Sequence, residues 1–443
     1  MQVHLKLKTS MAAVLAAGVV AVAAALPAHA AEQYFPVLSY RVGDYAAGGS
    51  GFYGGMIDYW NLVNAKGGVN GVKITYEECE TGYVPARAVE CYERLKKKSG
   101  GASAVEPLGT GAAYGLLDRV AVDKIPLTTV GYGRADSADG KTFPYVFPLI
   151  TTYWSQMSGM IKYLGSKEGG MDKLKGKTIV HLYHDSAYGK EPIPVLEAYE
   201  KQLGFKLVKI PIPPASGTEQ GAQWLQIRQT NPDYVILWGY GVMNTVALKT
   251  AKKTGFPVTK ILGVWWAGSE EDVIPAGDAA NNYVTTTFTP SGTYPLVEEI
   301  RKTLYGAGKG NLEDKDRIGS VYHLRGLAAG IMYVEAMRLA QDKYGKGKPV
   351  SGEQLRWGFE NINLDDAKLK AIGALGMMPT VKTSCADHEG SGAVKIQKWN
   401  GKKWEPVTKD WIVGDRDMIQ KMVQESAAKY AADKKITPAC AAG

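Results

Sequence analysis

The sequence predicts an α/β fold of two similar lobes with a ligand cleft between them. Two stretches of the chain, 102–133 and 234–268, share one plan: a short apolar run, a glycine-rich turn, a helical segment and a second apolar run. This plan is typical of a βαβ unit, so each lobe is expected to be Rossmann-like. Loops at the carboxyl ends of parallel strands carry the ligands of such sheets. Two units therefore predict two facing sets of loops, which suits a cleft that closes on a small molecule.

Residues 1–30 are predicted to be a signal peptide rather than part of the fold. Lys6 and Lys8 precede an apolar run at 11–26, and small residues flank a cleavage point at Ala30. These features are typical of export to the periplasm with cleavage near Ala30. An uncleaved membrane anchor is the alternative, but the run is short for a span and ends at a proline. The rest of the 443-residue chain exceeds what one core holds, which indicates two domains.

The composition indicates an ordinary globular protein. Hydrophobic residues make up 45% of the chain and charged residues 22%, both typical of globular domains, and the formal net charge is +8. Lysine runs such as 96–98 stand among acidic residues, as on solvated helix faces. No nucleic-acid partner is therefore expected.

The first lobe is predicted to alternate strands and helices. A strand is expected at 36–42, followed by a glycine-rich loop at 43–55 and a helix at 56–65 whose apolar residues share one face. A helix at 85–98 begins at a proline, whose missing N–H is harmless in the first turn. The other expected elements are strands at 72–76 and 102–105, an extended segment at 145–150 and a helix at 151–164.

The second lobe repeats this alternation. Its expected elements are strands at 178–184, 206–210, 234–238 and 260–264 and helices at 194–203 and 220–230. An apolar, β-branched run at 283–287 is interpreted as the return of the chain to the first lobe. Beyond it, the pattern predicts helices at 317–342, 351–361 and 418–430, the second of them with a capping box, and a hairpin of 393–399 and 402–407 on an Asn-Gly turn.

The order of these elements predicts two discontinuous lobes. The N-terminal lobe is expected to hold residues 31–150 and 284–385, and the C-terminal lobe residues 151–283 and 386–430, with a tail at 431–443. Several crossings between the lobes would form a hinge that bends and twists, which suits capture and release. The pattern indicates no function for residues 342–381.

The four cysteines are expected to form two disulfides. An even count in an exported protein favours disulfide bonds, and the predicted pairs are Cys79 with Cys91 and Cys385 with Cys440. A metal site is the alternative, disfavoured because the sequence holds no Cys-x-x-Cys motif and no nearby pair of histidines. No metal and no cofactor is expected.

The turn Gly109-Thr110-Gly111 is a candidate anion site. It lies between a predicted strand and a predicted helix, where free backbone N–H groups and the Thr110 hydroxyl can hold a carboxylate without a fixed cation. A purely structural glycine turn is the alternative. A dinucleotide site is disfavoured because the glycine spacing differs and no acidic residue follows the next strand.

Aromatic residues with polar ends gather near the predicted strand ends. The chain holds 25 Tyr and 10 Trp but only 8 Phe, and both types favour ligand sites because they combine stacking area with a polar group. Trp265 is preferred over Trp266, which points away if the run stays extended. Core packing is the alternative for each. The candidates are Tyr45, Tyr132, Tyr153, Trp154, Tyr188, Tyr240, Trp265 and Trp266.

Several motifs occur in the order and spacing of a known family. They are Asn64–Gly71, Glu106–Gly111, His184–Gly189, Asn231–Asp233, Lys252–Phe256 and the hairpin Val394–Trp404. On these motifs, over residues 37–411, the chain resembles the periplasmic solute-binding proteins of ABC transporters, in the branched-chain amino-acid (leucine/isoleucine/valine-binding) group. The resemblance implies a type I periplasmic binding protein fold, a small-molecule ligand between the lobes, no catalysis and a membrane permease as partner. A monomer is expected.

The resemblance also implies which residues contact the ligand. Thr110 corresponds to a hydroxyl and backbone donor to a ligand carboxylate, and the loop of Tyr132 and Gly133 meets the same group. Tyr188 and Tyr240 correspond to second-lobe contacts made on closure. Two of the aromatic candidates, Tyr153 and Trp265, complete this set. The predicted ligand-binding residues are Gly109, Thr110, Tyr132, Gly133, Tyr153, Tyr188, Tyr240 and Trp265.

One departure from the family pattern bears on the ligand. Amino-acid binders of the family place a glutamate after the strand at 261–264, where it pairs with the ligand ammonium, whereas this chain has Trp265. A buried ammonium without a partner is disfavoured by on the order of several kcal/mol. The predicted ligand is therefore a small organic carboxylate, aromatic or otherwise lacking an α-ammonium. The alternative is an amino acid, which would need Glu270 or Asp44 to reach the cleft.

The sequence favours a binding protein over an enzyme. It holds no Gly-x-Ser-x-Gly, His-Glu-x-x-His or Walker motif, and His184 has no nucleophile beside it, so a structural role is expected for that histidine. The predicted function is the extracytoplasmic binding subunit of an ABC importer. A ligand sensor that signals through a membrane receptor, or an enzyme on the same scaffold, is a further alternative.

Overall fold

The computed structural model describes residue 1 and residues 31–440, except for the side chain of Ser216. The predicted signal peptide lies outside the described residues. Among the described helices, none combines the length and apolar character needed to cross a bilayer.

The first sheet is small and parallel. Strand β1 (Glu32–Val37) pairs with β2 (Lys73–Glu78), and β3 (Leu127–Thr128) pairs with β4 (Val146–Phe147). Residues Val105 and Glu106 connect the two pairs through single bridges to Leu127 and Val37. The strand predicted at 102–105 is therefore reduced to this bridging segment. Helices α1 (Ala46–Ala65), α2 (Pro85–Leu95) and α3 (Thr110–Asp123) link the strands.

The second sheet has eight strands in the order β13-β12-β9-β8-β7-β5-β6, with β14 paired to β12. The parallel strands are β5 (Thr178–His184), β6 (Lys206–Ile212), β7 (Tyr234–Trp238), β8 (Ile261–Gly263) and β9 (Val284–Thr287), and the antiparallel ones are β12 (Ala393–Trp399), β13 (Trp404–Pro406) and β14 (Ile412–Val413). The helices of this part are α4 (Tyr153–Glu168), α5 (Ala187–Lys190), α6 (Ile193–Leu203), α7 (Gly221–Thr230), α8 (Val242–Lys253) and α9 (Glu270–Val273).

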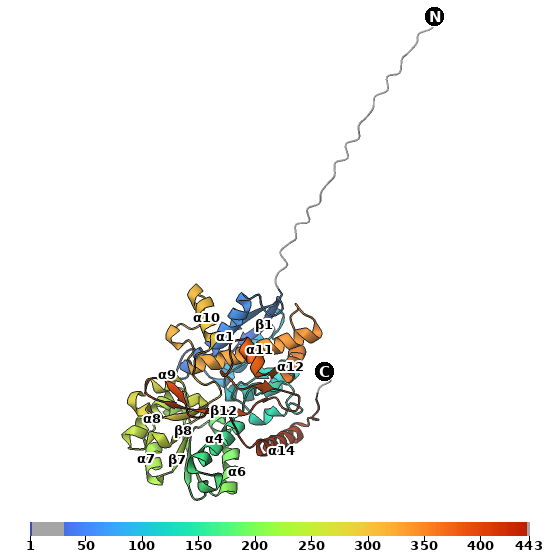
Figure 1. Ribbon diagram of the computed structural model, residues 1–443. Helices are drawn as coiled ribbons and strands as arrows, with labels where there is room; N and C mark the ends of the chain where they lie inside the picture. The colour runs from blue at the N-terminus through green and yellow to red at the C-terminus, as the bar shows by residue number, and fades with distance from the viewer. Residues whose placement is uncertain (2–30, 441–443) are drawn as a thin grey trace. The chain divides into compact units, whose positions relative to one another are not determined.

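The chain leaves the second sheet after β9 and returns to it at β12. The predicted lobe boundary at residue 284 falls at the first residue of β9, so the crossing comes after this strand and not before it. The intervening elements are α10 (Pro295–Thr303), α11 (Val321–Tyr344), α12 (Gly352–Glu360), β10 (Asn363–Leu364), α13 (Asp366–Ala371) and β11 (Val381–Lys382). The last helix is α14 (Arg416–Lys434). Figure 1 shows α11 alongside α1 and beside α12.

The glycine-rich segment predicted as a loop at 43–55 is instead helical, because α1 begins at Ala46. Glycine disfavours an isolated helix, which is why the prediction was wrong. In the fold these glycines let α1 touch α11 backbone to backbone. A Cβ on Gly55 would lie 2.1 Å from the carbonyl oxygen of His323, and a Cβ on Gly326 would lie 1.8 Å from that of Phe52. Only glycine permits this approach, so packing outweighs local propensity.

Other local predictions are confirmed. Pro85 stands in the first turn of α2, Ser351 and Gln354 form the capping box of α12, and β12 and β13 form the hairpin. Both predicted disulfides are present, and the Cα atoms are 5.8 Å apart in each pair, Cys79–Cys91 and Cys385–Cys440.

Candidate functional site

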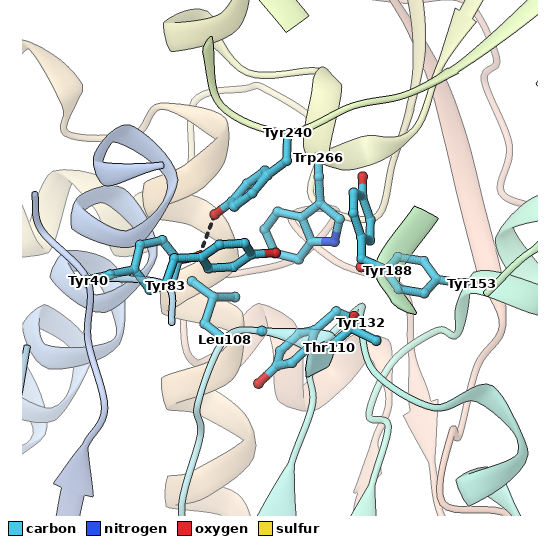
Figure 2. Close-up of a pocket in the computed structure, with 10 residues that line it drawn as sticks. Tyr40, Tyr83, Leu108, Thr110, Tyr132, Tyr153, Tyr188, Tyr240 and Trp266 are labelled. Atoms are coloured by element: carbon cyan, nitrogen blue, oxygen red, sulfur yellow. Dashed lines mark hydrogen bonds between the residues drawn. The ribbon is translucent and has the colours of Figure 1, made fainter. Parts of the chain in front are cut away.

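The loops of the two sheets enclose a cavity that is walled mainly by tyrosine, here called the tyrosine cavity (Figure 2). The volume that the centre of a water molecule can reach inside it is about 10 Å³, room for roughly one water. Its lining residues lie next to strand ends or helix starts, where ligands of parallel sheets bind. They are Tyr40, Tyr83, Leu108, Gly109, Thr110, Tyr132, Tyr153, Tyr188, Tyr240 and Trp266.

The structure brings six of the eight predicted site residues to this cavity. Gly133 lies just behind it, where its backbone N–H donates to the Thr110 hydroxyl over 3.4 Å. Trp265 is fully buried and does not line the cavity. The six that line it are Gly109, Thr110, Tyr132, Tyr153, Tyr188 and Tyr240.

The prediction that Trp265 faces the cavity and Trp266 points away was wrong. It assumed an extended run, but Trp265–Ala267 forms a turn of 3₁₀ helix, in which side-chain directions do not alternate. Both indole N–H groups donate to the carbonyl oxygen of Gly131, at 2.8 Å from Trp265 and 3.0 Å from Trp266. Trp265 instead stacks against Tyr153, with ring centres 5.8 Å apart, and so supports the wall from behind.

Most rings of the wall turn their polar ends away from the cavity. The Tyr240 and Tyr40 hydroxyls bond to each other, Tyr132 donates to Glu106, and Tyr188 donates to the carbonyl oxygen of Gly239 over 2.9 Å (Figure 2). The faces and edges of the rings, rather than their hydroxyls, therefore line most of the cavity. Burial raises the pKa of every lining tyrosine above its usual value of 10, so these residues are neutral at physiological pH.

Tyr83 and Tyr153 differ from the other tyrosines of the wall. Neither hydroxyl makes a hydrogen bond to a residue that the structure describes, and the two rings approach the centre from opposite sides (Figure 2). The backbone of Tyr83 is left-handed, with φ +62°, and Leu108 shares this feature with φ +37°. Side chains other than glycine seldom adopt such angles, and they gather at functional sites. Sequence reasoning missed Tyr40, Tyr83 and Leu108; the Gly82-Tyr83 pair before α2 is the available signal.

The first turn of α3 supplies the polar side of the cavity. Gly109 is its N-cap and provides no side-chain cap, so the first N–H groups of the helix have no intrahelical partner. The buried Thr110 hydroxyl stands beside them. Helix N-termini favour anions through these donors and through the helix dipole. Among the described residues, none of the side chains that line the cavity carries a charge.

Glu106 lies beneath the cavity and is held in its neutral form. Burial raises its pKa to about 8, although hydrogen bonds from Tyr132 and Thr128 oppose this shift. Its oxygens accept from the Tyr132 hydroxyl and, over 2.7 Å, from the Thr128 hydroxyl. At neutral pH this residue therefore adds no negative charge near the ligand.

The two alternative carboxylates do not reach the cavity. Glu270, at the start of α9, accepts from the backbone N–H of Val321 over 2.8 Å and lines a separate surface groove with Arg317. Burial and the neighbouring Glu271 raise its pKa to about 7. Asp44 is exposed, and its backbone carbonyl accepts from Val242 over 3.3 Å. Neither is placed to meet a ligand ammonium.

A buried arginine packs against Trp266. Arg325 of α11 is fully buried, and its guanidinium carbon lies 4.8 Å from the centre of the Trp266 ring and 5.3 Å from that of Tyr322. None of its guanidinium nitrogens has a hydrogen-bond partner among the described residues. Burial lowers its pKa from the usual value. The cation faces aromatic rings, an attraction that fixes their orientation.

Hydrogen bonds between the two sets of loops hold the cavity closed. The Tyr45 hydroxyl bonds to Nε2 of His184 over 2.9 Å, and Glu191 accepts from the backbone N–H of Ala135 over 2.7 Å and from Tyr114 over 3.0 Å. Burial lowers the pKa of His184 to about 4, so this histidine is neutral. These contacts join residues of the two sheets, as expected of a cleft that closes.

The fold and the closed cavity define a class of two-lobed ligand-binding proteins. The family of periplasmic binding proteins matches residues 32–403, most of the chain. The chain belongs to this family, and it is a substrate-binding protein of an ABC transporter, not an enzyme. A search of curated proteins finds no match.

Solved structures agree with this assignment. A structure from the Pseudomonas fluorescens group, described as an ABC transporter permease, is 45% identical with a TM-score of 0.86, covering 94% of this chain and 100% of that one. A branched-chain amino acid ABC transporter from Thermus thermophilus with bound valine is 20% identical (TM-score 0.74; 89% and 99% covered). A fatty acid ABC transporter substrate-binding protein from Thermomonospora curvata is 21% identical (TM-score 0.71; 88% and 94% covered). The last two share the type I periplasmic binding protein fold.

Proposed function

We propose that this protein captures a small organic carboxylate, aromatic or otherwise lacking an α-ammonium, for import by an ABC transporter. One observation carries the proposal: the tyrosine cavity offers uncharged donors at Thr110 and the start of α3, aromatic rings on the other sides, and no acidic side chain. A carboxylate meets its donors there, and a flat or apolar body meets the rings.

The mechanism is closure of the cleft around the anion. The ligand carboxylate is held by the first turn of α3, and Tyr188, Tyr240 and Trp266 approach it as the lobes close. Because the lining tyrosines are neutral, they do not repel an anion. Affinity in the micromolar range corresponds to about −8 kcal/mol, which is reachable with these groups.

Location and partner follow from the same role. Residues 1–30 direct export and are removed near Ala30, so the protein acts in the periplasm. We propose that it acts there as a monomer. The closed, ligand-loaded form docks on a membrane permease and releases its ligand as the lobes open.

An amino-acid ligand is the second candidate, since the Thermus thermophilus relative holds valine. That ligand would bring an ammonium into a cavity with no acidic side chain in its lining, and Glu106, which contacts the lining residue Tyr132, is neutral and already bonded to Tyr132 and Thr128. Burying an ammonium without a partner costs on the order of several kcal/mol, which disfavours this candidate.

Mass spectrometry of the native protein, purified without unfolding, tests the proposal. We expect a retained carboxylate without an amine. A thermal-shift panel then compares benzoate, phenylacetate and cinnamate with valine and leucine. A rise in Tm with valine or leucine, and with none of the acids, would replace the proposed ligand class by amino acids.

A further inference from the structure

A second, larger chamber adjoins the tyrosine cavity and is here called the outer chamber. The volume that the centre of a water molecule can reach inside it is about 290 Å³. Ligand pockets measure roughly 300–1,000 Å³, so the outer chamber supplies the space that the tyrosine cavity lacks. The two share Tyr83, Gly109 and Tyr188 as lining residues, and these residues therefore form the wall between them.

The outer chamber is apolar. It is lined from the first lobe by residues of the α2 and α3 starts and from the second lobe by residues after β5 and β6. His184, one of its few polar residues, is bonded to Tyr45 and to the Ser186 hydroxyl and is neutral. Its apolar residues are Val84, Pro85, Ala88, Pro107, Ala112 and Pro214.

The start of α3 lies between the two cavities, because its N-cap Gly109 lines both of them. Thr110 and Tyr153 line the tyrosine cavity alone, whereas Gly111 and Ala112 of the same helix line only the outer chamber. A carboxylate at Thr110 would thus have its apolar body directed along Gly109 toward the outer chamber. Of the two tyrosines in the wall between the cavities, Tyr188 is bonded to Gly239, whereas the Tyr83 hydroxyl is not held by any described residue, so the Tyr83 ring is the one that can turn aside.

Resting on the proposed function, we infer that the ligand is an elongated amphipathic carboxylate, whose head binds at Thr110 and whose apolar tail passes Tyr83 into the outer chamber. Both lobes line this chamber, so a bound tail also bridges them. Chain length, rather than ring shape alone, then sets the affinity.

Two probes test the inference: phenylacetate, which has the carboxylate and ring but only one methylene between them, and 8-phenyloctanoate, whose longer chain extends from Thr110 into the outer chamber. Each buried methylene contributes about 0.8 kcal/mol, so burial of two of the additional methylenes of 8-phenyloctanoate strengthens binding about tenfold. Calorimetry should therefore find that the long acid binds at least about tenfold more tightly than phenylacetate. Equal affinities, or binding of phenylacetate alone, would overturn the inference and leave the proposed function standing. Binding of neither acid would overturn both.

Two variants test whether the tail of the ligand binds in the outer chamber. Val84→Asn makes the chamber polar, and because Val84 is the N-cap of α2, where asparagine is favoured, the fold should not lose stability. Ala112→Leu fills part of the chamber. Each should weaken the long acid about fivefold or more and change phenylacetate by less than about twofold, since only the tail loses apolar contact. Val122→Asn, on the exposed side of α3, is the matched control and should change neither. If Ala112→Leu weakens both acids equally, or neither, the tail does not enter this chamber.

Discussion

The two βαβ units at 102–133 and 234–268 face the same cavity but present different groups to it. The first reaches it with the unpaired start of α3, the Thr110 hydroxyl and the strained backbone of Leu108. The second reaches it with Tyr240 and Trp266, whose polar ends are already bonded to Tyr40 and Gly131. One unit therefore offers free donors and the other offers rings.

This difference separates the two parts of recognition. The free donors of the first unit select an anion, because unpaired N–H groups at a helix N-terminus and the helix dipole both favour negative charge. The rings of the second unit add contact area and little directional demand. Substitutions in the second unit should therefore affect ligands in proportion to their apolar size, and substitutions in the first should distinguish an acid from its neutral analogue.

The largest effect is expected from the adjacent pair Trp265 and Trp266. Replacing either by alanine removes a buried indole and should lower the free energy of unfolding by about 3–5 kcal/mol. Only Trp266→Ala removes part of the cavity wall, so phenylacetate should bind about 10- to 100-fold more weakly to it, against about threefold for Trp265→Ala. Urea unfolding and calorimetry on both variants check this. A greater loss of affinity in Trp265→Ala than in Trp266→Ala would mean that Trp265, and not Trp266, contacts the ligand.

The second-largest effect is expected at Thr110, on the polar side of the tyrosine cavity. Thr110→Val keeps the shape of the side chain and removes the hydroxyl, which should weaken carboxylate binding about five- to tenfold. Thr129→Val is the matched control: the Thr129 hydroxyl is buried and has no partner among the described residues, so its removal should leave affinity unchanged. Equal losses in the two variants would show that Thr110 acts through packing alone.

Glu106 gives a pH-dependent test of the same side. Its pKa is about 8 in the folded protein against a usual 4.5, so the folded state keeps a proton that the unfolded state has lost between these values. The free energy of unfolding should therefore fall as pH rises from about 4.5 to about 8. Buried Glu191 and Glu270, with pKa values of about 7, act in the same direction. Glu106→Gln should flatten the slope most clearly between pH 7 and 8, as measured by urea unfolding at each pH. An unchanged slope in this variant would mean that Glu106 is ionised.

The smallest effect is expected at the bond between the Tyr40 and Tyr240 hydroxyls, which joins the two lobes. Tyr40→Phe and Tyr240→Phe each remove the same bond and should weaken ligand binding by about threefold to fivefold. The double variant should lose no more than either single one, because the shared interaction is lost only once. Additive losses would assign the two hydroxyls separate roles.

Local patterns in the sequence predict much of the fold. The capping box of α12, the proline at the start of α2 and the Asn-Gly hairpin depend on neighbours in the sequence, so they can be predicted from it. The glycines of α1 could not be assigned in this way, because their partner, α11, begins more than 250 residues later.

The residues of the candidate site also differ in whether neighbours in the sequence are enough to predict them. Thr110, Tyr188 and Tyr240 follow strand ends, which the apolar runs reveal. The choice between Trp265 and Trp266 depends on a 3₁₀ turn that forms around the Gly131 carbonyl, far away in the sequence. Tyr83 depends on a left-handed backbone that no periodic pattern indicates.

The central claim is that the start of α3 grips an anion against an aromatic wall. Calorimetric titration with phenylacetate and with its neutral analogue phenylacetamide tests it most directly. We predict that the acid binds about 10- to 100-fold more tightly, since hydrogen bonds to a charged acceptor contribute more than those to a neutral one. Equal affinity for acid and amide, or binding of valine where neither binds, would contradict the account.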